Sequence, residues 1–246
     1  MTSTNPQRVV ARFTRDDCLF CGAQPVTKEH LIAAWVFRAI QRTRRPTLNH
    51  LRQNIDSGVS TWSYGEHEEA AGVACQGCNT GWMSQSDQAA SRLLKPLLQR
   101  RYDAVLDAAE RRLVALWTVK TVMVNDQPIT GGHSQLAPYA RELRAMGQPQ
   151  DFLEVWVGYP QRPALGADFQ MIGVTPRNGR LVLGSGRDQK DHTLYAWSLM
   201  LGHGDLMVRP TLRWVPLPDP EGYERLWPSS PSTLTIRFEP PSEASG

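Results

Sequence analysis

The chain has 246 residues, of which 41% are hydrophobic, and a formal net charge of +3. This length is enough for a sizeable core in one large domain or two modest ones. No run approaches the roughly 18 apolar residues that a membrane-spanning helix needs, and residues 1–13 lack the apolar segment of a secretory signal. We therefore expect a cytoplasmic protein with no membrane-spanning segment.

The first hundred residues predict a mixture of strands and short helices. Hydrophobic spacing favours a helix, and residue alternation favours a strand. After a loose tail over residues 1–14, we expect a strand at 26–30, a helix at 31–41, a polar loop at 43–58, and strands at 59–64 and 70–74. Asn79 then has the residue type of a helix N-cap, which predicts a helix over residues 80–95 that stops before Pro96.

The remainder of the chain predicts helices followed by strands. Residues 104–125 carry the strongest helical pattern, and residues 136–146 form a shorter helix. Short β-rich runs separated by turn residues then follow, at 152–159, 169–175, 180–184, 192–201 and 205–209. The expected fold class is therefore α+β, with one domain at residues 1–100 and a helical, then antiparallel-sheet domain of unknown role at residues 101–246.

All four cysteines lie in two Cys-x-x-Cys pairs, Cys18 with Cys21 and Cys75 with Cys78. Each pair can supply two thiolates to one tetrahedral ion, and together they would fill a closed structural zinc site. The alternatives are two disulfides or a redox pair, but disulfides are rare in the reducing compartment that we expect. The 53 residues between the pairs exceed a compact zinc ribbon and indicate an inserted segment.

The two cysteine pairs bracket the dipeptide Glu29-His30, and Asn79 follows the last cysteine directly. The segments CLFCGAQPVTKEHLIAAW and VACQGCNTGWMSQSD resemble the HNH endonuclease family, in particular a bacterial group with a Cys-Asn-x-Gly-Trp-Met-Ser motif. The resemblance covers about residues 15–95. It implies a zinc-stapled ββα-metal module, in which two strands and a helix hold one catalytic divalent ion.

The resemblance also implies roles for individual residues in phosphodiester hydrolysis. His30 matches the general base, and Asn79 matches the residue that orients it. Glu29 matches the acidic metal ligand that precedes the base. The third motif position is usually His or Asn but falls here on Asp87 or Gln88, and we choose Asp87 because a carboxylate suits Mg²⁺ or Mn²⁺. Zinc would have only a structural role.

The basic residues are concentrated near the N-terminus, where residues 1–60 hold nine Lys and Arg against four Asp and Glu. Arg38, Arg42, Arg44 and Arg45 can contact nucleic-acid phosphates, but a solvated helix face and loop explain them equally well. The leading hypothesis is a metal-dependent endonuclease acting on DNA, with homodimerisation left open. The alternatives are a non-catalytic zinc module that binds nucleic acid or protein, and an HNH scaffold redirected to other chemistry.

Overall fold

The computed structural model describes residues 13–40, 47–54, 58–65, 70–99, 104–134, 136–158, 167–177, 180–183, 194–201, 204–210, 223–228 and 234–236. Within these ranges the chain is a mixture of helices and strands, which confirms the predicted α+β class. None of the described helices combines the length and the apolar character needed to cross a membrane.

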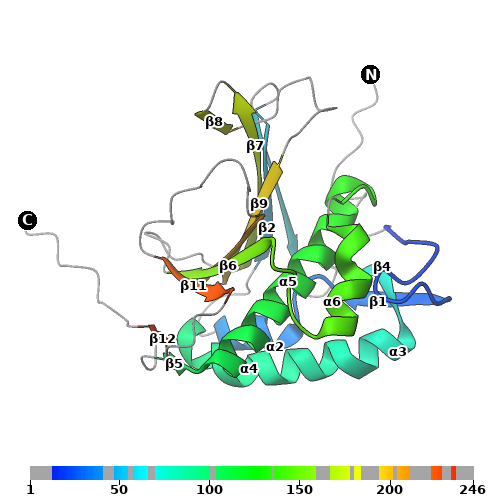
Figure 1. Ribbon diagram of the computed structural model, residues 1–246. Helices are drawn as coiled ribbons and strands as arrows, with labels where there is room; N and C mark the ends of the chain where they lie inside the picture. Colours follow the sequence, from blue (N-terminus) through cyan, green and yellow to red (C-terminus); the bar gives the residue numbers. More distant parts are fainter. Residues whose placement is uncertain are drawn as a thin grey trace, which may run out of the picture.

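A two-stranded antiparallel sheet followed by a helix carries most of the predicted site (Figure 1). Strand β1 (Val26–His30) pairs with β4 (Ala70–Cys75), which confirms both predicted strands. The register shifts between Thr27 and Lys28, where a bulge leaves Val73 without a partner in the ladder. The chain then continues through α3 (Gln76–Cys78), the π-helical turn η1 (Asn79–Met83) and α4 (Ser84–Leu98).

Both predicted ends of this helical segment were wrong. Helical structure begins at Gln76, with Cys75 in the N-cap position, so Asn79 is not an N-cap. Its amide group is used as a hydrogen-bond donor to β1 instead. At the other end, α4 continues through Pro96 to Leu98, because a proline removes only one backbone donor from a helix that is otherwise held by packing.

The segment between β1 and β4 contains α2 (Ala34–Ile40), β2 (Thr47–Asn54) and β3 (Gly58–Gly65). The helix starts three residues later than predicted, and β3 confirms the strand expected at 59–64. The polar loop expected at 43–58 was wrong, because half of it forms β2. This polar strand pairs with its chain neighbour β3 on one side and with β7, which is distant in sequence, on the other.

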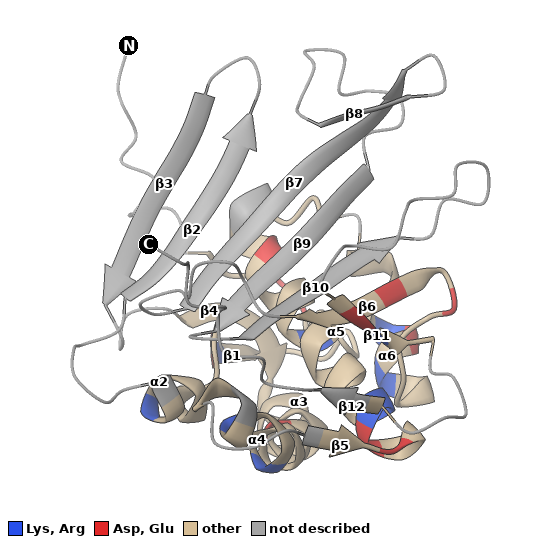
Figure 2. Ribbon diagram, turned by 90° about the vertical axis from the view of Figure 1, so that its left-hand side faces the viewer, with Lys and Arg blue, Asp and Glu red and all other residues tan. Residues whose placement is uncertain are grey.

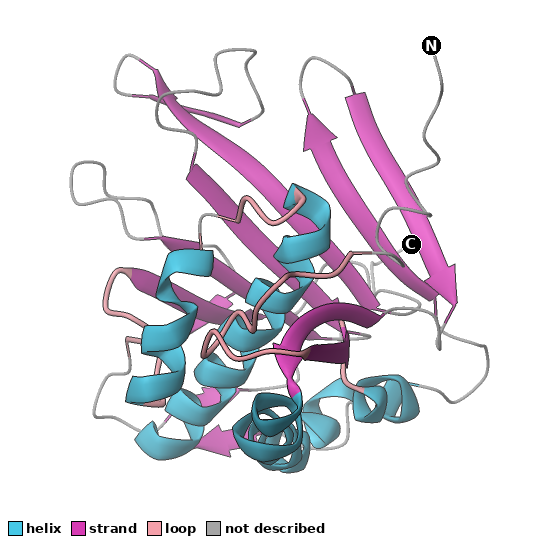
Figure 3. Ribbon diagram, turned by 90° about the vertical axis from the view of Figure 1, so that its right-hand side faces the viewer, coloured by secondary structure: helices cyan, strands magenta, loops and turns pink. Residues whose placement is uncertain are grey.

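Helix α5 (Ala108–Thr130) is the central helix of the molecule (Figure 1), and Figure 3 shows helices lying in front of the strands of the large sheet. It starts later than predicted because residues 104–106 form strand β5 and Asp107 caps the helix in a capping box with Glu110. It contacts α4 and β4 as well as strands of the large sheet. Side chains all around it are therefore buried, including polar Thr118 and Lys120.

The largest sheet has eight strands in the order β11-β6-β10-β9-β7-β2-β3, with β8 paired to β7. Its later strands are β6 (Leu153–Gly158), β7 (Ala167–Arg177), β8 (Arg180–Leu183), β9 (Leu194–Leu201), β10 (Gly204–Pro210) and β11 (Tyr223–Trp227). The five predicted β-rich runs correspond to β6 through β10. All pairings are antiparallel except that of β2 with β7, which joins strands from the two sides of residue 100.

Three short elements complete the described fold. The turn η2 (Ala137–Tyr139) leads into α6 (Ala140–Met146), which together correspond to the helix predicted at 136–146. Helix α6 packs beside α5, as Figure 1 shows. Strand β12 (Leu234–Ile236) pairs with β5 in a separate two-stranded sheet. The chain near its C-terminus thus returns to the segment that precedes the central helix.

Candidate functional site

The first cysteine pair lies in a tight turn. The N–H of Gly22 donates to the carbonyl of Cys18 at 2.8 Å, and the N–H of Cys18 donates to the carbonyl of Ala23 at 3.0 Å. Gly22 has a φ of 75°, which glycine adopts without the steric cost that a side chain would add. The turn therefore presents the side chains of Cys18 and Cys21 from one short knuckle.

The second cysteine pair is placed by β4 and the helix that follows it. Cys75 is the last residue of β4, and Cys78 is the last residue of α3. The first knuckle is attached to this strand by a hydrogen bond of 2.9 Å from the Leu19 N–H to the carbonyl of Val73, at the β-bulge. Backbone hydrogen bonds thus bring the two pairs together.

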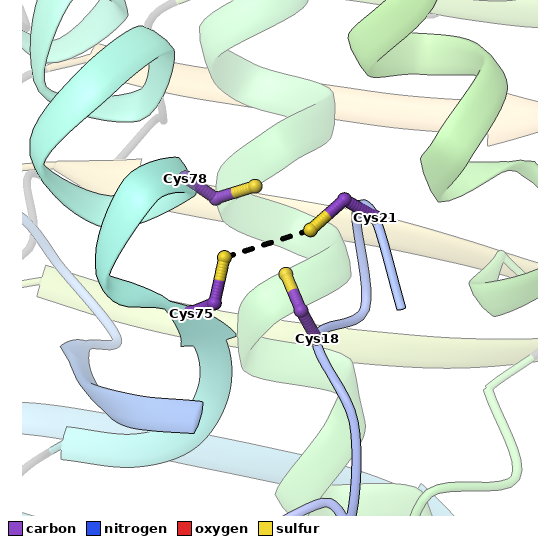
Figure 4. A group of neighbouring side chains, drawn as sticks. All are labelled: Cys18, Cys21, Cys75 and Cys78. Atoms are coloured by element: carbon purple, nitrogen blue, oxygen red, sulfur yellow. Dashed lines mark hydrogen bonds between the residues drawn. The ribbon is translucent and has the colours of Figure 1, made fainter. Parts of the chain in front are cut away.

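The four sulfur atoms point toward a common centre (Figure 4). They all lie within 4.8 Å of one another, and the Sγ atoms of Cys21 and Cys75 are 3.5 Å apart. A disulfide needs about 2.05 Å, and none of the four cysteines is in a disulfide. A tetrahedron with Zn–S bonds of about 2.3 Å has edges of about 3.8 Å. The group can therefore hold a metal ion such as zinc, as predicted.

The surroundings of the thiols shift their pKa values in different directions. Burial acts to raise the pKa of Cys21, but hydrogen bonds from the Ala23 backbone and from the other three thiols outweigh it and lower that pKa to about 7. Burial raises the pKa values of Cys18 and Cys78. Cys21 therefore ionises more readily than Cys18 or Cys78. A bound cation would release the remaining protons.

Two asparagine side chains hold the backbone on either side of Glu29-His30. Asn79 Nδ2 donates to the carbonyl of Lys28 and to Thr27 Oγ1, both at 3.3 Å. Asn125 Nδ2, on the buried face of α5, donates to the carbonyl of Leu31 at 2.7 Å. The backbone is therefore held by η1 at the residue before the dipeptide and by α5 at the residue after it.

The side chains of Glu29 and His30 lie in different environments. Glu29 is buried with 8% of its surface exposed, whereas His30 is exposed. Successive side chains of a strand point to opposite faces, which accounts for the difference. Burial, together with the nearby Asp87 charge and against the attraction of Lys120, raises the pKa of Glu29 to about 7. His30 is left available to a molecule that approaches from solvent.

Asp87 forms an ion pair with the central helix. Its Oδ1 accepts a hydrogen bond of 2.6 Å from Trp117 Nε1 and one of 2.7 Å from Lys120 Nζ. The Lys120 side chain is only 4% exposed, and that of Asp87 is 19% exposed. Gln88, the other residue at this motif position, is exposed and donates to Ser84 Oγ. Asp87 thus faces the interior and not the solvent.

The carboxylates of Glu29 and Asp87 have the donor chemistry of a Mg²⁺ or Mn²⁺ site. However, an ammonium group already contacts Asp87 and interacts electrostatically with Glu29. Hydrogen-bond donors from Lys120 and Trp117 thus already occupy Asp87 Oδ1, and we derive no step of a reaction through such an ion. The role of these two residues as metal ligands stays a prediction.

Exposed basic side chains gather on two adjacent helices. Arg38 on α2 is exposed, as are Arg92 and Lys95 on α4. Figure 2 shows basic residues on both helices, and Gln99 Nε2 links the two by donating to the carbonyl of Ala39. The only acid in either helix is Asp87, which is paired with Lys120. Arg42, Arg44 and Arg45 lie outside the described residues.

Sequence reasoning missed three residues that shape this site, namely Trp117, Lys120 and Asn125. All three lie on α5, and a usable indication was present in the sequence. A lysine inside the apolar run WTVKTVMV is unusual, because a buried ammonium needs a counter-ion. That indication predicts an acidic partner without identifying it.

Comparisons with known proteins do not assign the chain to a family. No protein-family model matches it, and the searches of curated proteins and of solved structures each found no match. The functional argument therefore depends on the residues themselves.

Proposed function

We propose that this chain is an endonuclease that hydrolyses phosphodiester bonds of DNA, with His30 as the general base. The observation that carries the proposal is the fixed backbone around Glu29-His30, held by Asn79 at Lys28 and by Asn125 at Leu31. A group that transfers a proton must be held in one position to be effective. A purely structural zinc module does not need an exposed histidine at such a position.

The order of the elements agrees with the resemblance to HNH endonucleases. Two antiparallel strands, β1 and β4, are followed by α3, η1 and α4, and the cysteine group joins the knuckle to the strand and helix. Zinc bound there would fix β1 relative to the helix without taking part in chemistry.

The reaction adds water across a phosphoester bond. His30 accepts a proton from water, the water oxygen bonds to phosphorus, and the bond from phosphorus to the leaving oxygen breaks. The leaving oxygen takes a proton from the solvent, and His30 releases its proton to the solvent. Imidazole is suited to this transfer near neutral pH. A divalent ion, when bound, would neutralise part of the negative charge on the phosphate. The exposed Arg38, Arg92 and Lys95 are suited to hold the DNA backbone.

Plasmid nicking in Mg²⁺, Mn²⁺ or Ni²⁺ tests the proposal. We expect nicking by the wild type and at least a hundredfold loss in His30→Ala, since general-base catalysis contributes about 10²–10⁴-fold. His30 is exposed, so the variant should keep its zinc content and melting temperature. His133→Ala is the matched control, because His133 is also exposed but follows α5. Full activity in His30→Ala, or no nicking by the wild type, would refute the assignment.

The ion pair between Lys120 and Asp87 favours a second candidate function. If the internal ammonium permanently supplies the charge that a catalytic ion would bring, the unit is a zinc-stabilised module that binds DNA without cleaving it. The same preparation separates the two candidates, because the module would retard DNA in a gel and leave the plasmid intact with every ion tested.

A further inference from the structure

The cysteine group has one side in the core and one side that reaches solvent. Cys18 and Cys78 are buried, with 0% and 1% of their surface exposed, and both belong to the hydrophobic core. Cys21 and Cys75 are only half-buried, and Gln76, directly after Cys75, is exposed. A small molecule that approaches from solvent therefore meets Cys21 and Cys75 before it meets the other two thiols.

The two half-buried cysteines also lie next to each other. Their Sγ atoms are 3.5 Å apart, as the dashed line in Figure 4 marks, although the residues are 54 positions apart in the chain. A disulfide has a length of about 2.05 Å, so the two sulfur atoms together need to move by about 1.5 Å to form one. Every other pairing of the four cysteines includes Cys18 or Cys78, which are buried.

We propose that Cys21 and Cys75 are an oxidation site, at which hydrogen peroxide forms a disulfide and the cysteine group loses its metal ion. One thiolate sulfur attacks a peroxide oxygen, the O–O bond breaks and hydroxide leaves, which gives a sulfenic acid. The second thiolate attacks that sulfur, the S–S bond forms and another hydroxide leaves. Each sulfur loses one electron, the peroxide gains both, and the two hydroxides take protons from the solvent.

The disulfide leaves only two thiolates for an ion. A structural zinc site has four ligands, so Cys18 and Cys78 alone do not close around zinc. The new bond still joins the first knuckle to β4, whereas Cys78, at the end of α3, loses its link to the knuckle. Asn79 follows directly and donates to β1, so the loosening begins beside the residue that holds the strand. A reversible disulfide of this kind is typical of redox sensing in reducing compartments.

Peroxide treatment of the reduced, zinc-loaded wild type tests the pairing, with free thiols alkylated afterwards and disulfides located by peptide fragmentation. We expect the Cys21–Cys75 disulfide to be about tenfold more abundant than any other, because oxidation follows the exposure of the thiols. Zinc released to a chromogenic indicator should match the disulfide in amount. Dithiothreitol with added zinc should restore both the thiols and the melting temperature.

The same treatment in urea is the matched control, and it requires no variant to fold. The unfolded chain should instead favour the two Cys-x-x-Cys pairs, because these close the shortest loops. A folded protein that gives the same mixture as the unfolded chain, or that forms its disulfide within either Cys-x-x-Cys pair, would overturn the inference. Thiols that resist peroxide, or zinc that stays bound after the disulfide has formed, would overturn it as well.

Discussion

Two groups of ionisable side chains can be compared: the cysteine group (Cys18, Cys21, Cys75 and Cys78) and Glu29, Asp87 and Lys120, which we call the carboxylate–lysine cluster. Both are assembled from the β1–β4 sheet and the elements around it, but they differ in how their charge is balanced. The cysteine group holds four acidic donors, and the pKa values of Cys18, Cys21 and Cys78 are set by burial, backbone groups, neighbouring thiols and Trp82. The carboxylate–lysine cluster contains its own cation, Lys120. The first therefore needs an external ion to ionise fully. In the second, Asp87 has an internal counter-ion, whereas burial still destabilises the charged form of Glu29.

The largest effect expected from this comparison is on the cysteine group. Cys75→Ser should lose the bound ion and unfold the surrounding unit, because structural zinc contributes on the order of 10 kcal/mol in zinc-finger peptides. Elemental analysis and thermal melting of the purified variant measure both effects. Ser84→Ala, a nearby change at the start of α4, is the control. If Cys75→Ser has the melting temperature of the wild type, the cysteine group does not need a bound ion, and the comparison with the carboxylate–lysine cluster fails.

The next effect concerns Glu29, whose pKa is raised from 4.5 to about 7. The folded protein binds this proton more tightly than the unfolded chain does, so stability falls as the pH rises from about 4.5 to about 7. Glu29→Gln should abolish that fall and stabilise the protein at pH 8 by about 3 kcal/mol at most. At pH 4 the variant and the wild type should be equally stable.

Urea unfolding at the two pH values, without added divalent ions, checks this expectation. Glu142→Gln is the matched control, because Glu142 is an exposed residue of α6. A Glu29→Gln protein that is less stable than the wild type at pH 8 would show that Lys120 compensates Glu29 fully, and the cluster would then resemble an ordinary buried ion pair.

A smaller effect is expected on the basic surface of α2 and α4, away from both clusters. Replacing Arg38, Arg92 and Lys95 by alanine should weaken DNA binding equally for all sequences. If each contacts one phosphate, the slope of log affinity against log salt should become shallower by about 2.7. Arg144→Ala on α6 is the control, since that arginine is also exposed. An unchanged slope of log affinity against log salt would show that the DNA binds to another surface of the protein.

The smallest effect on stability is expected for Asn79→Ala. The two hydrogen bonds lost are long, at 3.3 Å, so the free energy of unfolding should fall by about 1 kcal/mol. Cleavage should fall further, by about 10–100-fold, as for other residues that orient a catalytic group. Gln88→Ala on the exposed side of α4 controls for the substitution itself. Equal cleavage activity of Asn79→Ala and Gln88→Ala would show that Asn79 has no role in catalysis.

The parts of the fold that could be predicted are those encoded locally. The spacing of Cys18, Cys21, Cys75 and Cys78 predicted a common metal-binding group, and residue alternation over residues 59–64 predicted β3. The conformation of β2 could not be read in this way, since its polar sequence is held as a strand by pairing with β3 and with β7, the latter more than a hundred residues later.

The carboxylate–lysine cluster was predictable only in part, for the same reason. Glu29 and Asp87 were selected from the resemblance to the family motif, but the residue that pairs with Asp87 is Lys120, on a helix outside the resembling segment. Asn79 was predicted as both a helix cap and an orienting residue. The cap was wrong because its amide group donates to β1.

The most direct test of the central claim, that the cysteine group alone needs an external metal ion, is X-ray absorption at the zinc edge of the protein as purified. The account predicts one zinc per chain with four sulfur neighbours at about 2.3 Å and no nitrogen or oxygen neighbour. Zinc bound through oxygen or nitrogen atoms, or a protein without zinc in which the four cysteines form two disulfides, would contradict it.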